Sequence, residues 1–107
     1  MAPHNTFYIA VACPSCGQMV DIWLQADIGE LRYDSYSIGD LVIKRIPPMK
    51  PYGPSEDCDF SRPFWALGLD ECSLCNADIR MRVHVRDRRY VGVEPAQPGD
   101  QDFAWGY

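Results

Sequence analysis

The sequence predicts a mostly β domain, an antiparallel sheet that carries two tight C-x-x-C turns and a long proline-rich loop. Three observations lead to this fold class. The C-x-x-C steps at 13–16 and 72–75 each lie between segments with the composition of strands. Apolar and polar residues alternate strictly over 77–86, with the period of two of a half-buried strand. Five of the nine prolines fall within 47–63, where they cannot donate N–H groups to a sheet.

The expected strands form two similar halves. In the first half, 6–12 is rich in β-branched and aromatic residues and leads into the first cysteine turn, and 19–25 leaves that turn with alternating side chains. In the second half, 64–69 and 77–86 repeat the arrangement around the second turn. The sequence therefore predicts an approximate duplication of strand, cysteine turn and strand.

Three further segments complete the expected sheet. The stretch 31–36 is a weaker strand candidate, and 41–46 is an apolar run that ends at Pro47. After a turn, 90–94 returns as an antiparallel partner of the preceding strand. We expect any helix to be confined to one or two turns.

The expected domain organisation is one β domain over 1–94, with a long loop at 47–63, followed by a C-terminal tail over 95–107. Loops of this length are either spacers or binding segments, and both interpretations stay open. The tail carries Phe103 and Trp105, whose rings either dock on the domain or form a contact segment.

The cysteine turns have the form of metal knuckles. Each brings two sulfurs together and is followed by a residue that tolerates positive φ, a glycine after the first and an asparagine after the second. Two knuckles supply four thiolates, the ligand set of a closed, structural zinc site. We therefore expect one structural Zn²⁺, which clamps the start of the domain to its distal half and offsets loop-closure entropy. The expected ligands are Cys13, Cys16, Cys72 and Cys75.

The alternatives without metal are two disulfides or one redox-active pair. The N-terminal residues lack the pattern of a secretory signal, and no apolar run reaches the roughly 18 residues of a membrane span, so we expect a cytoplasmic protein without a membrane partner. In a reducing compartment, paired cysteines are read first as metal ligands. A thioredoxin-like cysteine would begin a helix, whereas 18–24 alternates like a strand.

The formal net charge is −5, and four bound thiolates with one Zn²⁺ change it by −4 and +2 to about −7. Such acidity disfavours general binding to nucleic acid. One basic patch nevertheless lies within 80–89. It is either a solvated face neutralised by neighbouring carboxylates or a site for an anionic partner, an acidic protein or a nucleic-acid backbone. Its members are Arg80, Arg82, Arg86, Arg88 and Arg89.

No catalytic constellation is visible, and we expect that the protein is not an enzyme. The chain has two histidines and lacks the Ser–His–Asp, H-E-x-x-H, G-x-G-x-x-G and P-loop patterns. A zinc ion closed by four cysteines has no open position for water. His84 is expected on the solvent face of its strand, and Cys58 is expected to be an uninvolved thiol, with a ligand or nucleophile role as the alternative.

The two knuckles resemble a zinc ribbon in the broad rubredoxin-like sense, on the four cysteines named above. The resemblance implies an antiparallel zinc-ribbon-like sheet, but ribbons serve in transcription, translation, ubiquitin recognition and structural bracing, so it leaves function open. The stretch Tyr36-Ser37-Ile38-Gly39-Asp40 is similar to one in small uncharacterised bacterial zinc-ribbon proteins of antitoxin or immunity type. That similarity implies an inhibitory role.

We therefore expect a zinc-braced acidic protein-interaction module, such as an immunity protein or inhibitor that neutralises a basic toxin or enzyme. The alternative is a nucleic-acid-associated zinc ribbon that uses the hairpin at 80–89. The expected contacts to a basic partner are three loop carboxylates and three aromatic anchors: Glu56, Asp57, Asp59, Trp23, Phe103 and Trp105.

Overall fold

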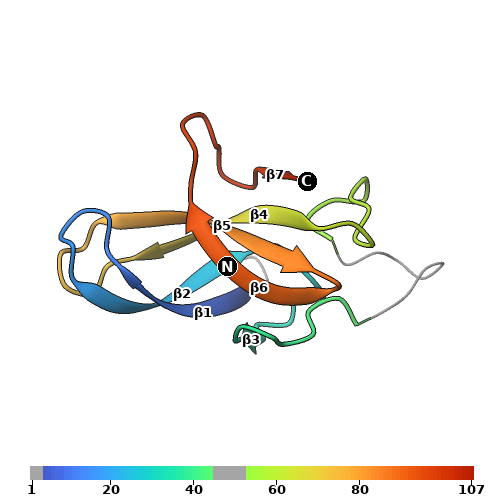
Figure 1. Cartoon of the computed structure of the whole chain (residues 1–107), viewed down its shortest axis with the longest axis horizontal. Coiled ribbons are helices and arrows are strands. Elements are labelled where there is room, and N and C mark those ends of the chain that lie inside the picture. The colour runs from blue at the N-terminus through green and yellow to red at the C-terminus, as the bar shows by residue number, and fades with distance from the viewer. Residues whose placement is uncertain (1–3, 45–52) are drawn as a thin grey trace.

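In the computed structural model, which describes residues 4–44 and 53–107, the chain forms one curled, seven-stranded sheet (Figure 1). Within those residues no helix is formed, and the predicted mostly β class is confirmed. No helix in the described part of the chain is long and apolar enough to cross a membrane. The strands are β1 (Asn5–Ala12), β2 (Met19–Ala26), β3 (Ser35–Tyr36), β4 (Phe64–Glu71), β5 (Asp78–Arg86), β6 (Arg89–Pro95) and β7 (Trp105–Gly106).

The strand order is β3-β1-β2-β4-β5-β6, and β7 pairs with β4. All pairs are antiparallel except β1 with β3, so the sheet is mixed rather than purely antiparallel as predicted. The parallel pair arises because the chain after β2 returns to the far edge of β1 before it forms β3. A return of this kind makes the next strand run in the same direction as β1.

The two cysteine-bearing halves are the hairpins that the duplication predicts. Eight register pairs join β1 to β2, and eight join β4 to β5. Between the halves, in contrast, β2 and β4 share one register pair, Gln25 opposite Leu69. The sheet is therefore continuous within each half and only narrowly joined between them.

The core fills the inner face of the curled sheet. Val20, Ile22 and Leu24 of β2 are buried in alternation with exposed neighbours, as the period of two predicts. The inner face of β5 is buried in the same alternating way. Tyr90 of β6 closes the curl, because its ring packs edge-on against Phe7 of β1 and its hydroxyl donates to a β1 carbonyl at 3.0 Å. Tyr90 thus links β6 to β1 across the core.

The strand predicted over 41–46 is wrong for the part that the structure describes. Leu41 forms one isolated bridge to Arg89, and no strand covers 42–44, while 45 and 46 lie outside the described residues. The N–H groups of Val42 and Ile43 both donate to the Arg88 carbonyl, at 2.8 and 3.2 Å. In an extended strand, consecutive N–H groups point to opposite sides, so two of them cannot donate to the same carbonyl. Val42 and Ile43 are buried because the segment packs over the turn before β6. An apolar run can therefore be buried here without forming a strand.

The weaker strand candidate over 31–36 shortens to β3 alone. Tyr33 has a φ of 60°, outside the β region, and breaks any strand that would precede β3. The amide of Asn5, whose side chain is fully buried, holds this segment in place. Its Nδ2 donates to the carbonyls of Ile28 and Glu30, and its Oδ1 accepts from the N–H groups of Arg32 and Asp34.

The C-terminal segment packs against the sheet. Trp105 and Gly106 pair with Ala66 and Trp65 of β4, and the Tyr107 hydroxyl accepts the Asp59 N–H at 2.7 Å. The docking alternative for Trp105 therefore holds, whereas the Phe103 side chain remains 77% exposed. The strand β7 occupies the edge of β4 that β2 leaves free.

Candidate metal centre

Both cysteine turns lie together at one end of the long axis of the molecule, between β1 and β2 and between β4 and β5 (Figure 1). Their backbones repeat the same two bonds. In the first, the Gly17 N–H donates to the Cys13 carbonyl at 2.9 Å, and the Cys13 N–H donates to the Gln18 carbonyl at 2.8 Å. In the second, the Asn76 N–H donates to the Cys72 carbonyl, and the Cys72 N–H donates to the Ala77 carbonyl, both at 2.9 Å.

The residues after the second cysteine of each turn are in the left-handed region, as predicted. Gly17 has a φ of 75° and Asn76 a φ of 62°. Glycine adopts this conformation without steric cost, and asparagine tolerates it better than most residues. Each chain reversal is therefore encoded locally, by the residue type that its backbone needs.

The four sulfurs converge on one point. All four Sγ atoms lie within 4.8 Å of one another, with Cys13 to Cys75 at 3.8 Å and Cys16 to Cys72 at 3.9 Å. No disulfide joins any of them. Four sulfurs about 2.3 Å from a central ion, at the corners of a tetrahedron, would be about 3.8 Å apart. The cluster therefore fits one tetrahedral metal ion such as Zn²⁺, with thiolate ligands.

The first cysteine of each knuckle is the buried one. Cys13 and Cys72 are each 1% exposed, while Cys75 lies at the surface. The N–H groups of Ser15 and Leu74 approach the Cys13 and Cys72 sulfurs at 3.4 Å. Backbone N–H groups, chiefly that of Cys16, lower the pKa of the Cys13 thiol to about 7. These backbone N–H groups thus favour the thiolate form of Cys13, which is buried and so receives little stabilisation from solvent.

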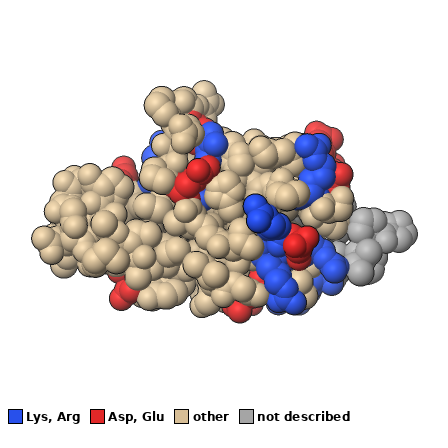
Figure 2. Space-filling view, viewed as in Figure 1, with Lys and Arg blue, Asp and Glu red and all other residues tan. Residues whose placement is uncertain are grey.

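Apart from the cysteine ligands, the tip around the metal centre carries no charged side chains. Residues 12–19 and 72–77 contain no Asp, Glu, Lys or Arg, and Figure 2 shows this end of the molecule as mostly uncharged surface. Met19 and Leu74 are 67% and 63% exposed at the two knuckles. The charged surface of the protein therefore lies elsewhere.

Cys58 is separate from the four-sulfur cluster. It is 5% exposed and packs in the core. Burial, reinforced by the nearby Asp59 carboxylate, raises the pKa of its thiol to about 11. Such a thiol forms little of the reactive thiolate, in line with the expectation of an uninvolved cysteine.

The predicted partner-contact residues occupy different settings. Glu56 and Asp57 are exposed, whereas the Asp59 carboxylate accepts bonds from the Ser61 N–H and hydroxyl. Trp23 is 48% exposed and lies against Tyr8, with ring centroids 5.3 Å apart. Phe103 is exposed, but Trp105 is half-buried in β7 and packs edge-on against Tyr107. The bond from the Asp59 N–H to the Tyr107 hydroxyl places the loop carboxylates beside the C-terminal segment, whereas Trp23 lies on β2.

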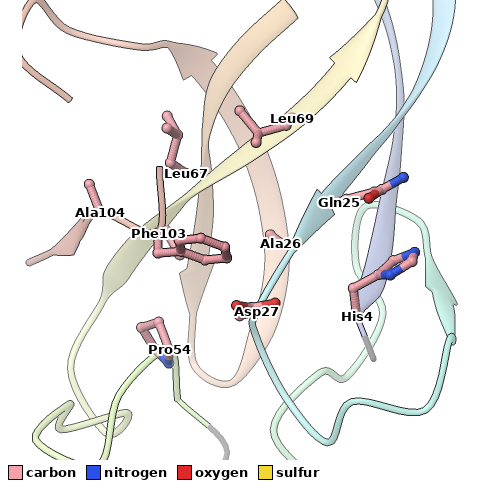
Figure 3. Close-up of a pocket in the computed structure, with 10 residues that line it drawn as sticks. His4, Gln25, Ala26, Asp27, Pro54, Leu67, Leu69, Phe103 and Ala104 are labelled. Carbon is pink, nitrogen blue, oxygen red and sulfur yellow. The ribbon is translucent and has the colours of Figure 1, made fainter. Parts of the chain in front are cut away.

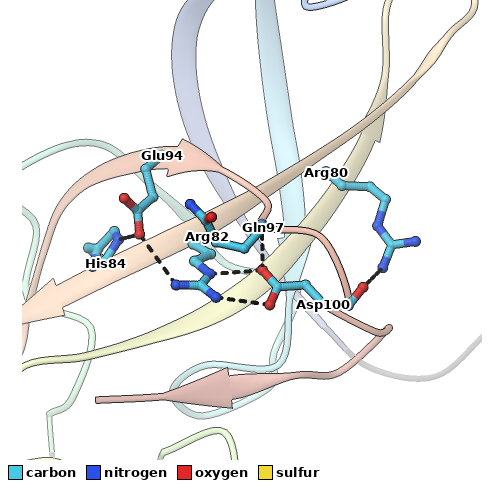
Figure 4. A network of polar contacts seen from close by, with 6 residues as sticks. All are labelled: Arg80, Arg82, His84, Glu94, Gln97 and Asp100. Carbon is cyan, nitrogen blue, oxygen red and sulfur yellow. Dashed lines mark hydrogen bonds and ion pairs between the residues drawn. The ribbon is translucent and has the colours of Figure 1, made fainter.

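Two of the five arginines are tied to the C-terminal segment (Figure 4). Arg82 binds both carboxylate oxygens of Asp100, at 2.8 and 2.9 Å, and its guanidinium lies 3.9 Å from the centre of the Trp65 ring. Arg80 donates to the Asp100 carbonyl at 2.9 Å and pairs with Asp102 at 3.1 Å. The bond from Arg82, together with the Gln97 N–H, lowers the pKa of Asp100 to about 2.

The remaining charged groups of this face are divided between paired and open positions. His84 is half-buried rather than exposed as expected, and its Nε2 lies 2.9 Å from Glu94. Arg89 donates to the Gly39 carbonyl at 2.9 Å, and Arg86 is exposed on the same hairpin. Arg88 lies at the turn with a φ of 64°. The five arginines therefore do not form one open basic surface.

Two acidic features were not identified from sequence. Glu71 lies directly opposite Asp78 in the β4–β5 register, and both side chains are exposed. Among the described residues, neither carboxylate forms a hydrogen bond or ion pair. Like charges opposite each other in a sheet are destabilising. The second feature is Asp27, which lines a cavity beside β4. The register of the second hairpin could have predicted the first feature, whereas no local pattern marks Asp27.

Comparison with known proteins does not assign the chain to a family: no protein-family model, no curated protein and no solved structure matches it significantly.

Proposed function

We propose that the chain is a zinc-braced protein-interaction module whose acidic surface binds a basic protein, such as a toxin or enzyme that it neutralises. The observation that carries the proposal is the contrast in charge pairing. Arg80 and Arg82 form ion pairs with carboxylates of the same chain. Glu71 and Asp78 face each other at the surface without a cation among the described residues. A cationic partner would relieve this repulsion.

Zinc is the metal that suits this role. Four thiolates in a tetrahedral cluster are a soft donor set, which selects Zn²⁺ over Mg²⁺ or Ca²⁺. A site with four protein ligands has no position left for substrate or water, so its contribution is structural. The ion braces the two hairpins against each other at the end where β2 and β4 diverge.

The alternative, a nucleic-acid-associated zinc ribbon, would use the hairpin at 80–89. Arg86 and the turn arginines remain the candidates for phosphate contacts, and a local basic cluster can bind phosphate despite a net charge of −5. The pairing of Arg80 and Arg82 with the C-terminal segment leaves fewer free donors for this purpose. The acidic-surface proposal is therefore the better supported of the two.

One experiment separates the two functions. The zinc-loaded protein is used as bait in a lysate of its native host, and each recovered protein is purified and its affinity measured at 50, 150 and 400 mM salt. The same salt series is run with a generic DNA duplex and a generic RNA. The proposal expects a basic protein whose affinity falls with salt and no saturable nucleic-acid binding.

Charge reversal supplies the matched variants. Glu71→Lys with Asp78→Lys should weaken the protein complex at least tenfold, because exposed acidic charge attracts the partner. Arg86→Glu, on the same strand β5, should leave the complex within about twofold. Strong nucleic-acid binding that Arg86→Glu abolishes would support the alternative, and a complex insensitive to both changes would overturn the acidic-surface proposal.

A further inference from the structure

A cavity of about 230 Å³ opens on the edge of β4, between the end of β2 and the start of β7 (Figure 3). It exists because two different strands share this edge. Leu69 pairs with Gln25 of β2, while the Leu67 N–H donates to the Ala104 carbonyl at 2.9 Å, just before β7. The two neighbours of β4 do not meet, and the gap between them is lined mainly by apolar side chains, among them Leu67, Leu69 and Phe103.

One carboxylate lies among the lining residues, which also include the polar side chains of His4 and Gln25. Asp27 is half-buried, and Figure 3 shows it in the middle of the lining residues, with Phe103 and Pro54 on one side and His4 on the other. No hydrogen bond or ion pair joins it to another residue of the described chain. Burial raises the pKa of Asp27, which the attraction of His4 opposes. Partial removal of a carboxylate from water has a cost, and a bound cation would offset it.

The approach to the cavity is acidic. A second hollow shares Gln25 and Leu69 with it and extends along the outer face of the sheet toward the metal centre. Glu71 and Asp78, the two opposed carboxylates, line this second hollow. Four carboxylates and one cation, Arg80, line this second hollow, so the charge beside the cavity is net negative, which favours a cation and disfavours phosphate.

Phe103 lies at the rim of the cavity. Its φ of 65° is uncommon for a residue with a side chain, and its ring is 77% exposed although it lines the cavity. The neighbouring Ala104 carbonyl is anchored to β4. An exposed aromatic face beside a carboxylate is the arrangement that recognises the end of an alkylammonium or guanidinium group.

We propose that the Asp27 cavity receives one lysine or arginine side chain of the basic partner. The aliphatic stem lies on Leu67 and Leu69, and the charged end pairs with the Asp27 carboxylate beside the Phe103 ring. An apolar side chain would fill the same space but leave the carboxylate buried without a partner. The inference rests on the proposed function for the nature of the partner, whereas the cavity and its chemistry are independent of it.

The test uses model side chains and needs no partner. The ¹⁵N-labelled, zinc-loaded protein is titrated with N-acetyl-lysine methylamide and N-acetyl-arginine methylamide, and with the neutral N-acetyl-norleucine methylamide. We expect saturable amide shifts at Asp27, Leu67 and Ala104 with the two cations only. Asp27→Asn should abolish them, while Asp57→Asn, which removes the same charge from an exposed position, should leave the affinity within twofold.

Each other outcome overturns the inference. An equal response to the norleucine derivative would show an apolar cavity without cation selectivity, and no response would show that the cavity takes none of these side chains. Butylammonium, the free amine, is the third arm, and tighter binding of it than of the capped amino acids would indicate a small-amine site. Any of these results leaves the acidic-surface proposal standing, because that proposal fails only when charge reversal of Glu71 and Asp78 leaves the protein complex unchanged.

Discussion

Gln25 of β2 lies opposite Leu69 of β4, and in the described chain this is the one register pair that joins the two cysteine-bearing hairpins. From this point toward the metal centre the strands diverge, and the Trp23 N–H donates to the Asp70 carboxylate at 2.8 Å instead of to a strand carbonyl. Beyond that bond, the four sulfurs converge between the two hairpins. The metal is therefore expected to supply the cross-link that the sheet lacks there.

The first prediction concerns the metal. Elemental analysis of the reduced protein should find one zinc per chain, and chelation should unfold the knuckle end, because structural zinc sites contribute about 10–16 kcal/mol in small peptides. Cys13→Ser and Cys72→Ser should have the same effect. Amide exchange should rise first in β2 and β4 at the side of the Gln25–Leu69 pair that faces the knuckles. Reduced protein without metal that keeps full protection there would contradict the prediction.

Cys58 provides the matched control for those variants. Cys58→Ser should retain one zinc, since its thiol is outside the four-sulfur cluster. It should nevertheless lower the free energy of unfolding by about 1–3 kcal/mol, because a hydroxyl would replace a thiol that is 5% exposed. Zinc content and urea denaturation measure the two effects separately. A loss of zinc would show that Cys58 takes part in the site.

Asn5→Ala should be among the most destabilising single changes, on the order of 3 kcal/mol. The fully buried amide satisfies four backbone groups of residues 28–34, and its removal leaves them without partners. Urea denaturation of the zinc-loaded protein measures the loss. Thr6→Ala, at the half-buried neighbour whose hydroxyl bonds to Ser35, is the control and should cost less than about 1 kcal/mol. Equal effects of the two changes would contradict this account.

Gly68→Ala should destabilise the protein by about 1–3 kcal/mol through overpacking. A methyl group at this position would lie 2.8 Å from the Leu24 Cβ and 3.0 Å from a Val83 methyl carbon. Gly17→Ala tests a different cause, since nothing lies within 4 Å of its added methyl and only the positive φ opposes it. Combining Gly68→Ala with Val83→Ala should recover part of the loss, and a purely additive result would argue against a clash.

The Asp100–Arg82 pair has a defined dependence on pH. The pKa of Asp100 is lowered in the fold to about 2, against about 3.9 for a free aspartate, so its stabilisation is complete above about pH 5 and is lost as the pH falls through 4 toward 2. Asp100→Asn should therefore lower the urea midpoint by the same amount at pH 8 and pH 6. The prediction would be contradicted if the difference in urea midpoint between wild type and variant disappeared between pH 8 and pH 6. Asp102→Asn, whose side chain is 59% exposed, should have the smaller effect.

The strands beside the knuckles and the metal ligands could be predicted from sequence because their causes are local. A C-x-x-C step followed by Gly17 or Asn76 specifies a tight turn whose hydrogen bonds span only a few residues. The alternation along β2 and β5 follows directly from the two faces of a strand. The residues themselves therefore determine which side chains face inward and which sulfurs converge.

The tertiary structure alone decided the pairing of distant segments. Nothing in the sequence near Arg82 indicates Asp100, and the apolar run from Leu41 gives the same pattern whether it forms a strand or packs as a loop over the turn before β6. The cavity at Asp27 depends on where β2 ends and β7 begins along β4. Such features follow from the register and the ends of strands that are far apart in the chain. The free energy that selects them is shared among many weak contacts, and no single residue pattern records it.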